Sequence, residues 1–403
     1  MFIARQPIFN RMLEVYGYEL LFRSEHDSKA YDGTSDVQST ATIISGLFES
    51  GIEEYVEDKR AFVNFDATFL NMDLAELIEP NCLIVEVLET VIVDQNLIEQ
   101  LENLKSKGYK IALDDFSESY NDYPLIPLAD IIKFDMLSSP LDRIRSDVKQ
   151  ALNQGKIILA EKVETEAEFK MAKEMGFHLF QGYFFSKPDI IGKSGDKTTT
   201  KIQYFRLMTE LKKIEPSYQI LAEIIEKDIK LAYRLMRVIS TRAGNDLVYS
   251  IKRALTYMGL KEIERWISIM MLRDLSEHKP QELMRLALVR TKFSELIATN
   301  GHMRKIKHEA SMMGLFSTID AMLDQSMSEA LEGISLPKSV FDALTMNQGV
   351  LAPVYNVIHN YERGDWSSAE LLGQHLGITE GELSMNYRDS LIWARDIVAM
   401  IYE

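Results

Sequence analysis

Over its first 190 residues the chain alternates short runs rich in Val, Ile and Phe with longer amphipathic stretches. The short runs are nearly continuous in hydrophobicity, as expected for strands that are buried on both faces. They lie at residues 15–23, 62–65, 83–87, 110–116, 131–136, 156–163 and 179–185. Helical patterns separate them at residues 36–49, 96–107, 141–153 and 164–175. This repeated strand-then-helix order predicts a parallel sheet that closes into a compact (β/α)8 barrel.

The second half of the chain has a different pattern. Residues 192–200, GKSGDKTTT, collect Gly, Ser, Thr and Lys, which indicates a linker. From residue 201 onward apolar residues recur at helical spacing, as at Leu221, Ile224 and Ile225, and Gly and Pro punctuate the pattern. We therefore predict a barrel domain at residues 1–190, a linker at 191–200 and an all-helical domain at 201–403.

The composition limits the partners of such a chain. Its 403 residues suit two domains, and its formal net charge of −16 opposes attraction to nucleic-acid polymers and anionic membranes. An anionic ligand therefore needs a local source of positive charge, either bound metal or a few focused Lys and Arg residues. The single cysteine, Cys82, excludes an internal disulfide and a cysteine-cluster zinc site. We find no signal peptide and no apolar run long enough for a bilayer, which predicts a cytoplasmic protein.

Polar residues interrupt the apolar strands, usually near the end of each run. They are Glu19, Asn64, Glu86, Asp114, Asp115, Lys133, Glu161 and Gln181. The C-terminal ends of parallel barrel strands converge on one mouth, so these positions predict a single acidic pocket. Taken one at a time, each residue has an alternative interpretation as a satisfied structural polar group. Their repetition in every strand–helix unit favours a functional pocket, because buried polar groups are costly without partners.

Carboxylates that are crowded together repel one another unless a cation lies between them. The pocket therefore indicates hard divalent ions, Mg²⁺ or Mn²⁺, which prefer oxygen ligands. The adjacent pair Asp114 and Asp115 is suited to bridge two such ions about 3.5–4 Å apart, the arrangement that activates water for attack on phosphorus. In this scheme Lys133 holds the attacking water or a phosphate oxygen.

At these residues the chain resembles the EAL domain family, bacterial cyclic di-GMP phosphodiesterases with a TIM-like (β/α)8 barrel. The matching motifs are QPI at 6–8, GYELLFR at 17–23, VNFD at 63–66, EVLE at 86–89, LDDF at 113–116, IKFD at 132–135, AEKVET at 160–165 and QGYFFSKP at 181–188. Leu20 stands where the family signature has alanine. These motifs occur in the family's order over about residues 1–190, which makes the resemblance specific.

The resemblance implies a role for each matched position. It implies metal binding by Glu19, Asn64, Glu86, Asp114 and Asp115. It implies that Lys133 and Glu161 orient or deprotonate the attacking water, and that Gln6, Arg23 and Gln181 contact the ligand. Arg23 would meet a phosphate, for which a guanidinium is well shaped, and Gln181 would also lie near the metals. Glu89 and Glu164 would support the loop after the DDF motif. Family members cut one phosphodiester bond of cyclic di-GMP to give linear pGpG.

The chain departs from the family pattern at two places. Residues 117–120 read SESY where the family has GTGY, and Lys162 stands where the family has glycine. The family glycines permit tight turns in the loop that positions the second aspartate, so their loss bears directly on metal binding. Three functions therefore compete. The first is a metal-dependent phosphodiesterase, which the intact ligand set favours; the second is a catalytically weak cyclic di-GMP sensor that relays a signal through the helical half. The third, a scaffold without nucleotide, is disfavoured by the retained acidic cluster.

The helical half resembles the HDOD domain, a helical relative of the HD phosphohydrolases that lacks their metal ligands. The matching stretches are ILAEIIEKDIKLAYRLMRVIS at 220–240 and YSIKRALTYMGL at 249–260. This half contains no His-Asp dipeptide, so we expect it to bind a protein partner or to transmit a signal rather than to catalyse. A homodimer is left open.

Overall fold

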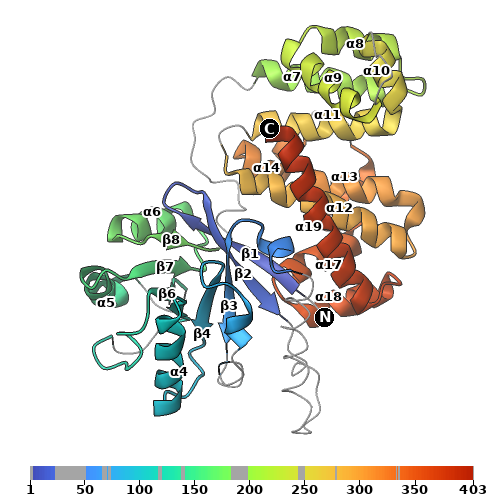
Figure 1. The fold of residues 1–403 in the computed structure, drawn as a ribbon. Coiled ribbons are helices and arrows are strands. Elements are labelled where there is room, and N and C mark those ends of the chain that lie inside the picture. Colours follow the sequence, from blue (N-terminus) through green and yellow to red (C-terminus); the bar gives the residue numbers. More distant parts are fainter. Residues whose placement is uncertain are drawn as a thin grey trace.

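The computed structural model describes residues 3–22, 51–65, 70, 74–116, 120–137, 141–182, 198–243, 250–276, 279–332, 334 and 336–402. Within these residues the strands of the first half form one closed barrel, and the second half consists of helices (Figure 1). The predicted fold class, a (β/α)8-type barrel followed by an all-α half, is confirmed.

The described strands close the barrel in sequence order. They are β1 (Ile3–Asn10), β2 (Val15–Phe22), β3 (Arg60–Phe65), β4 (Leu83–Val87), β5 (Lys110–Leu113), β6 (Ile131–Asp135), β7 (Ile157–Glu161) and β8 (Leu179–Phe180). Neighbours from β2 to β8 pair in parallel, whereas β1 runs antiparallel to both β2 and β8. The predicted parallel order therefore holds for β2 to β8, and β1 is the exception.

β1 is also the strand that the hydrophobic pattern does not predict. Its centre carries Arg5, Gln6 and Pro7, and a proline within an apolar run weakens the strand signal. In the barrel β1 lies between β2 and β8, and Gln6 is the register partner of Glu19. The sequence of this segment predicts a strand only weakly. It forms a strand because it pairs with β2 and β8 when the barrel closes.

The barrel half also contains helices. They are α2 (Glu53–Val56), the 3₁₀ helix η2 (Leu74–Leu77), α4 (Gln95–Ser106), α5 (Leu141–Asn153) and α6 (Glu166–Met175). α4 and α5 match their predictions closely, and the predicted helix at 36–49 lies outside the described residues. α6 begins later than predicted because Thr165 forms its cap: the Thr165 hydroxyl accepts from the Glu168 amide at 3.2 Å, and the Glu168 carboxylate accepts from the Thr165 amide at 3.0 Å.

A layer of apolar side chains fills the inside of the barrel. It consists of Ile8, Phe62, Ile84, Ala112, Ile131, Leu159 and Leu179, each from a different strand. All are buried. β2 has Gly17 beside this layer, where a Cβ atom would lie 2.8 Å from the ring of Phe62. The layer is the floor of the space at the C-terminal ends of the parallel strands.

Helices form the described part of the second half. They are α7 (Thr198–Leu211), α8 (Tyr218–Glu226), α9 (Ile229–Ala243), α10 (Ile251–Met258), α11 (Leu260–Leu275), α12 (Gln281–Asn300), η4 (Arg304–Ile306), α13 (Lys307–Phe316), α14 (Ile319–Leu323), α15 (Met327–Ala330), α16 (Lys338–Met346), α17 (Ala352–Glu362), α18 (Trp366–His375) and α19 (Glu380–Tyr402). The described end of the predicted linker, residues 198–200, is the start of α7. The domain bounds themselves stay a prediction. Among the described helices, none combines the length and the apolar character that a membrane crossing requires.

The helical half packs against β1, β2 and α2 through α12, α17 and α19, whereas α7 to α10 lie at its far end (Figure 1). The hydroxyl of Tyr18 in β2 donates to Glu282 in α12 at 2.9 Å. Arg388 in α19 forms an ion pair with Glu54 in α2. The helical half therefore covers β1, the strand that runs antiparallel to its neighbours in the barrel.

The chain directly after β8 leaves no room for a side chain at Gly182. A Cβ there would lie 2.3 Å from the carbonyl oxygen of Val163, and the φ of Gly182 is 151°. We predict that Gly182→Ala lowers the free energy of unfolding by about 3 kcal/mol, because the backbone of the neighbouring strand connection must move. Urea unfolding measures this loss. The control is Gly155→Ala, where φ is 71° but no atom lies within 4 Å, and where about 1 kcal/mol is expected. Equal losses in the two variants would contradict the prediction.

Candidate functional site

The predicted polar residues stand one layer above the apolar floor. Most lie two residues after a floor residue on the same strand, and side chains two apart on a strand share a face. The pairs are Phe62 with Asn64, Ile84 with Glu86, Ala112 with Asp114, Ile131 with Lys133, Leu159 with Glu161 and Leu179 with Gln181. β1 runs in the opposite direction, so its residue in the upper layer is Gln6, two positions before Ile8. The period of the strands thus gathers these side chains at one mouth.

The ammonium group of Lys133 lies at the centre of this layer. Its Nζ is 2.6 Å from Asp114 Oδ1, 2.8 Å from Glu86 Oε1 and 2.9 Å from Glu161 Oε1. Glu19 Oε2 lies farther away, at 3.7 Å. The side chains of Lys133 and Glu86 have no exposed surface. Among the described residues, four carboxylates therefore share one buried ammonium, and the cluster keeps an excess of negative charge.

Two amides hold Glu19 at the edge of the cluster. Asn64 Nδ2 donates to Glu19 Oε1 at 3.2 Å, and Gln181 Nε2 donates to Glu19 Oε2 at 2.7 Å. The backbone of Gln181 is itself fixed, because its N–H donates to the Ala160 carbonyl and its carbonyl accepts from the Val163 N–H. The position of Glu19 therefore depends on β3 and on the end of β8.

Burial and mutual charge shift the pKa values of the cluster strongly. Burial raises the pKa of Glu86 well above its usual range, although the nearby Lys133 ammonium opposes this shift. Burial likewise raises the pKa of Glu161 to about 8, again against the pull of Lys133. Burial by itself lowers the pKa of Lys133, but the surrounding carboxylates, Glu161 first, hold that pKa well above its ordinary value. The ammonium therefore stays charged, and Glu161 is poised to exchange a proton near neutral pH.

A second lysine meets the second aspartate of the DDF motif. Lys162 Nζ lies 2.6 Å from Asp135 Oδ2 and 3.5 Å from Asp115 Oδ2. Lys162 adopts a φ of 53°, in the left-handed region that glycine enters freely, and Asp115 has a φ of 37°. Lys162 thus keeps a glycine-like backbone while it places a cation beside Asp115.

The oxygen atoms of the site suit a hard cation by their chemistry. Asn64 Oδ1, Asp115 Oδ1, Glu161 Oε2 and Gln181 Oε1 are buried and have no hydrogen-bond partner among the described residues. Such orphaned oxygens are costly unless a ligand or ion contacts them. Within the described parts of the chain, however, no three acidic, histidine or cysteine side chains are arranged so that they could hold an ion. The carboxylates instead turn to Lys133, so the two-metal site stays a prediction.

The remaining predicted residues lie at the edge of the site or outside the described residues. Arg23 and the loop at 117–119 lie outside the described residues. Glu89 is exposed at the end of β4, and Glu164 is half-buried before α6. Gln6 accepts from Gln181 Nε2 at 3.1 Å, so it adjoins the site. The structure therefore brings together nine of the predicted residues, Gln6 among them, and the role of every predicted site residue stays a prediction.

Asp135 is a site residue that the sequence analysis did not select. It is buried, pairs with Lys162 and lies two residues after Lys133 on β6. The same period of two that identified Lys133 places Asp135 on that face, so the signal was available. Glu362 of α17, whose carbonyl meets Gln6, had no such signal, because it lies in the helical half of the sequence.

Comparisons with known proteins identify the families that the two halves match. Residues 1–188 match the family model of the EAL domain, and residues 199–336 match that of the HDOD domain. The chain is 33% identical to the uncharacterized protein YuxH of Bacillus subtilis (strain 168), over 98% of each chain. It is 32% identical to the cyclic di-GMP phosphodiesterase CdgJ of Vibrio cholerae serotype O1, over 99% of this chain and 94% of CdgJ. The chain belongs to the EAL–HDOD family. The resemblance drawn from the motifs is thereby confirmed for both halves.

Solved EAL structures overlap with part of this EAL–HDOD chain. One is the Bacillus subtilis YkuI protein in complex with cyclic di-GMP and calcium, with 20% identity, coverage of 66% of this chain and 73% of that one, and a TM-score of 0.39. Another is a standalone EAL protein of Vibrio cholerae O395 in its cyclic di-GMP-bound form, with 25% identity, coverage of 46% and 91%, and a TM-score of 0.35. At these TM-scores the likeness assigns no function to the chain.

The raised pKa of Glu161 predicts a pH-dependent stability. The folded protein holds the Glu161 proton up to about pH 8, whereas the unfolded chain releases it near 4.5, so the free energy of unfolding falls as the pH rises between these values. Glu161→Gln removes this contribution. In chelator-treated buffer, we expect urea unfolding to show that the free energy of unfolding falls between pH 5 and pH 8. This fall should be smaller in the variant than in the wild type, by about 1 kcal/mol or more. The control is Glu99→Gln on the exposed face of α4. A variant that loses as much stability as the wild type would contradict the assignment.

Proposed function

We propose that the protein is a metal-dependent phosphodiesterase that hydrolyses cyclic di-GMP to linear pGpG. The buried cluster of carboxylates around Lys133, with orphaned oxygens beside it, is the observation that carries the proposal. The full-length similarity to CdgJ, a cyclic di-GMP phosphodiesterase, supports the same substrate. A phosphodiester ligand is an anion, so an acidic site of this kind needs cations to receive it.

The donor set suggests how Mg²⁺ or Mn²⁺ would be held. Glu19, Asn64, Glu86, Asp114 and Asp115 would supply oxygen ligands, which both ions prefer. A bound divalent ion would neutralise phosphate charge and lower the pKa of a bound water. Gln6, Arg23 and Gln181 would contact the nucleotide.

The chain's own residues would perform the proton chemistry. Glu161 has a pKa of about 8, close to the value at which a carboxyl group exchanges a proton with water most effectively near neutral pH. Lys133, 2.9 Å from Glu161, stays charged and can orient the attacking water or a phosphate oxygen. In its ionised form Glu161 would take the proton that the water loses as the water oxygen bonds to phosphorus. The bond from phosphorus to the ribose oxygen would break, and that oxygen would take up a proton from solvent.

One observation favours a second candidate, a cyclic di-GMP sensor with weak turnover. Lys162 pairs with Asp135 and lies 3.5 Å from Asp115, so a fixed ammonium competes for an oxygen that a metal would need. A site with weakened metal binding would still bind the nucleotide through its amide and guanidinium groups. The helical half would then relay the bound state to a protein partner.

Hydrolysis of cyclic di-GMP by the purified full chain with Mg²⁺ or Mn²⁺ tests the first proposal. Chromatography should detect pGpG, and Glu19→Gln should lower the rate by at least about 100-fold, because it removes a charged ligand without changing the side chain's shape. Glu99→Gln on the surface is the matched control and should keep the wild-type rate. Calorimetric binding without turnover would favour the sensor. Absence of both turnover and binding would contradict both candidates.

The Lys162 ammonium predicts a measurable effect on metal affinity. Lys162→Gly keeps the positive φ without strain and removes the cation beside Asp115. We expect Mn²⁺ to bind the variant about three- to tenfold more tightly in calorimetry, since a like charge leaves the site. Lys170→Gly, an exposed position on α6, is the control for loss of a surface charge. Unchanged Mn²⁺ affinity in Lys162→Gly would show that this lysine does not compete with metal.

The other predicted interactions remain part of this proposal. The HDOD half would bind a protein partner, and a homodimer is compatible with either function. The net charge of −16 still argues against nucleic-acid polymers and anionic membranes as partners, and a cytoplasmic location stays a prediction from the sequence.

A further inference from the structure

The side-chain amide of Gln6 in strand β1 contacts the end of helix α17. Gln6 Nε2 donates to the backbone carbonyl of Glu362 at 3.3 Å. Glu362 is the last residue of α17, so its carbonyl is one of those that the helix itself leaves without a partner, and the end of the helix carries partial negative charge. Gln6 of the barrel therefore caps a helix of the other half.

The other end of the same amide faces the site. Gln6 Oε1 accepts from Gln181 Nε2 at 3.1 Å, and the second hydrogen of that nitrogen goes to Glu19 Oε2 at 2.7 Å. In this row of Glu362, Gln6, Gln181 and Glu19 the hydrogen bonds run through two amides: Gln6 donates to Glu362 and accepts from Gln181, and Gln181 also donates to Glu19. A change in the orientation of Gln6 that turns Gln181 with it would cost Glu19 one of the two amides that hold it.

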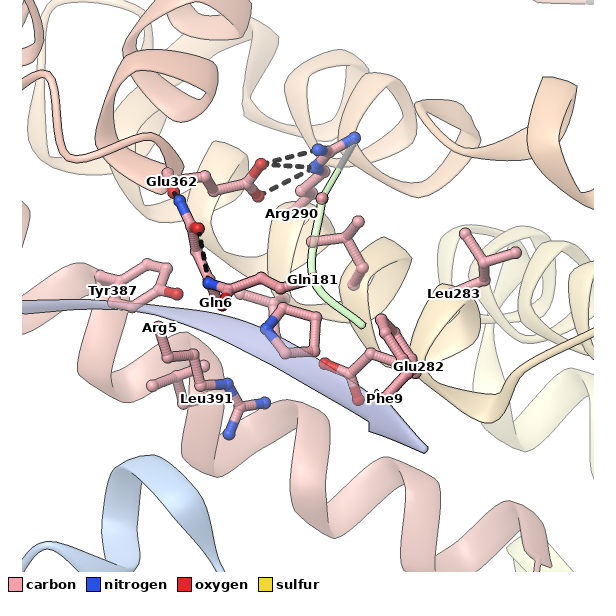
Figure 2. A pocket seen from close by; sticks show the side chains of 14 residues that line it. Arg5, Gln6, Phe9, Gln181, Glu282, Leu283, Arg290, Glu362, Tyr387 and Leu391 are labelled. Carbon is pink, nitrogen blue, oxygen red and sulfur yellow. Dashed lines mark hydrogen bonds and ion pairs between the residues drawn. The ribbon is translucent and has the colours of Figure 1, made fainter. Parts of the chain in front are cut away.

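The helical half holds its end of the row firmly. The carboxylate of Glu362 accepts hydrogen bonds from two nitrogens of Arg290 in α12. Nε lies 2.9 Å from Oε1, and Nη2 lies 2.6 Å from Oε2. Arg290 is buried, and such bidentate pairs are both strong and geometrically specific. Figure 2 shows the row from Arg290 through Glu362 and Gln6 to Gln181, along a cavity of about 110 Å³ between the two halves.

We propose that Gln6 is a positioning residue through which the helical half sets the orientation of Gln181 and Glu19. Displacement of α17 or α12 by a partner of the helical half would withdraw the Glu362 carbonyl from Gln6 and leave Gln181 free to turn away from Glu19. The consequence for cyclic di-GMP rests on the proposed function, whereas the coupling itself does not. Arg388 gives a matched comparison, because its ion pair with Glu54 also joins the two halves but touches no member of the row.

The coupling is tested on the full chain without any ligand. Protein labelled with ¹⁵N in its glutamine side chains gives a Gln181 amide resonance, assigned by its absence in Gln181→Met. Arg290→Met and Gln6→Met should both move this resonance, and Arg388→Met should leave it in place, while thermal melting verifies that each variant is folded. An unmoved resonance in Arg290→Met, or equal shifts in Arg290→Met and Arg388→Met, would overturn the proposal.

The same variants report on function separately. Gln6→Met and Arg290→Met should weaken cyclic di-GMP binding or turnover by about fivefold, a typical size for coupling between sites, and Arg290→Lys should give a smaller effect because it keeps the charge. Arg388→Met should stay within about twofold. If the wild-type protein neither binds nor cleaves cyclic di-GMP, the proposed function fails, and the glutamine resonances still decide the coupling.

Discussion

The buried ammonium of Lys133 is the interaction on which the rest of the site depends. It has no exposed surface and compensates Glu86, Asp114 and Glu161 at distances of 2.6 to 2.9 Å. Without this charge the carboxylates would repel one another and take up protons, because burial already raises the pKa values of Glu86 and Glu161. One ammonium cannot balance them all, however. The remaining negative charge and the orphaned oxygens are the features on which the proposal of bound divalent ions rests.

The apolar floor makes this arrangement possible. Residues such as Phe62, Ile131 and Leu159 fill the barrel below the cluster and exclude water from that side. Charges that stand above such a layer interact more strongly than they would in water, which explains both the shifted pKa values and the cost of any unpaired atom. Lys162 lies at the rim of the site, where its half-exposed ammonium pairs with Asp135 and lies near Asp115. Water reaches this ammonium, whereas it does not reach that of Lys133.

The helical half contacts the strands that form one side of the site. It covers β1 and β2 with α12, α17 and α19. Of these helices, α17 and α19 lie beyond the residues that match the HDOD domain. Because β1 carries Gln6 at the level of the polar layer, the interface between the halves is one hydrogen bond away from Gln181. A relay of this kind gives an EAL barrel a means to respond to events in a helical partner without any large movement.

The sequence by itself determined the order of strands and helices and the face on which each polar residue stands. Both follow from local periodicity: apolar runs mark β2 to β8, and a step of two residues separates the floor from positions such as Glu86 and Lys133. Only the tertiary structure decided that β1 closes the barrel antiparallel, that the carboxylates gather on Lys133, and that Gln6 meets the carbonyl of Glu362. That last contact spans 356 positions of sequence, and no local pattern encodes a pairing that exists only after both halves have folded and packed together.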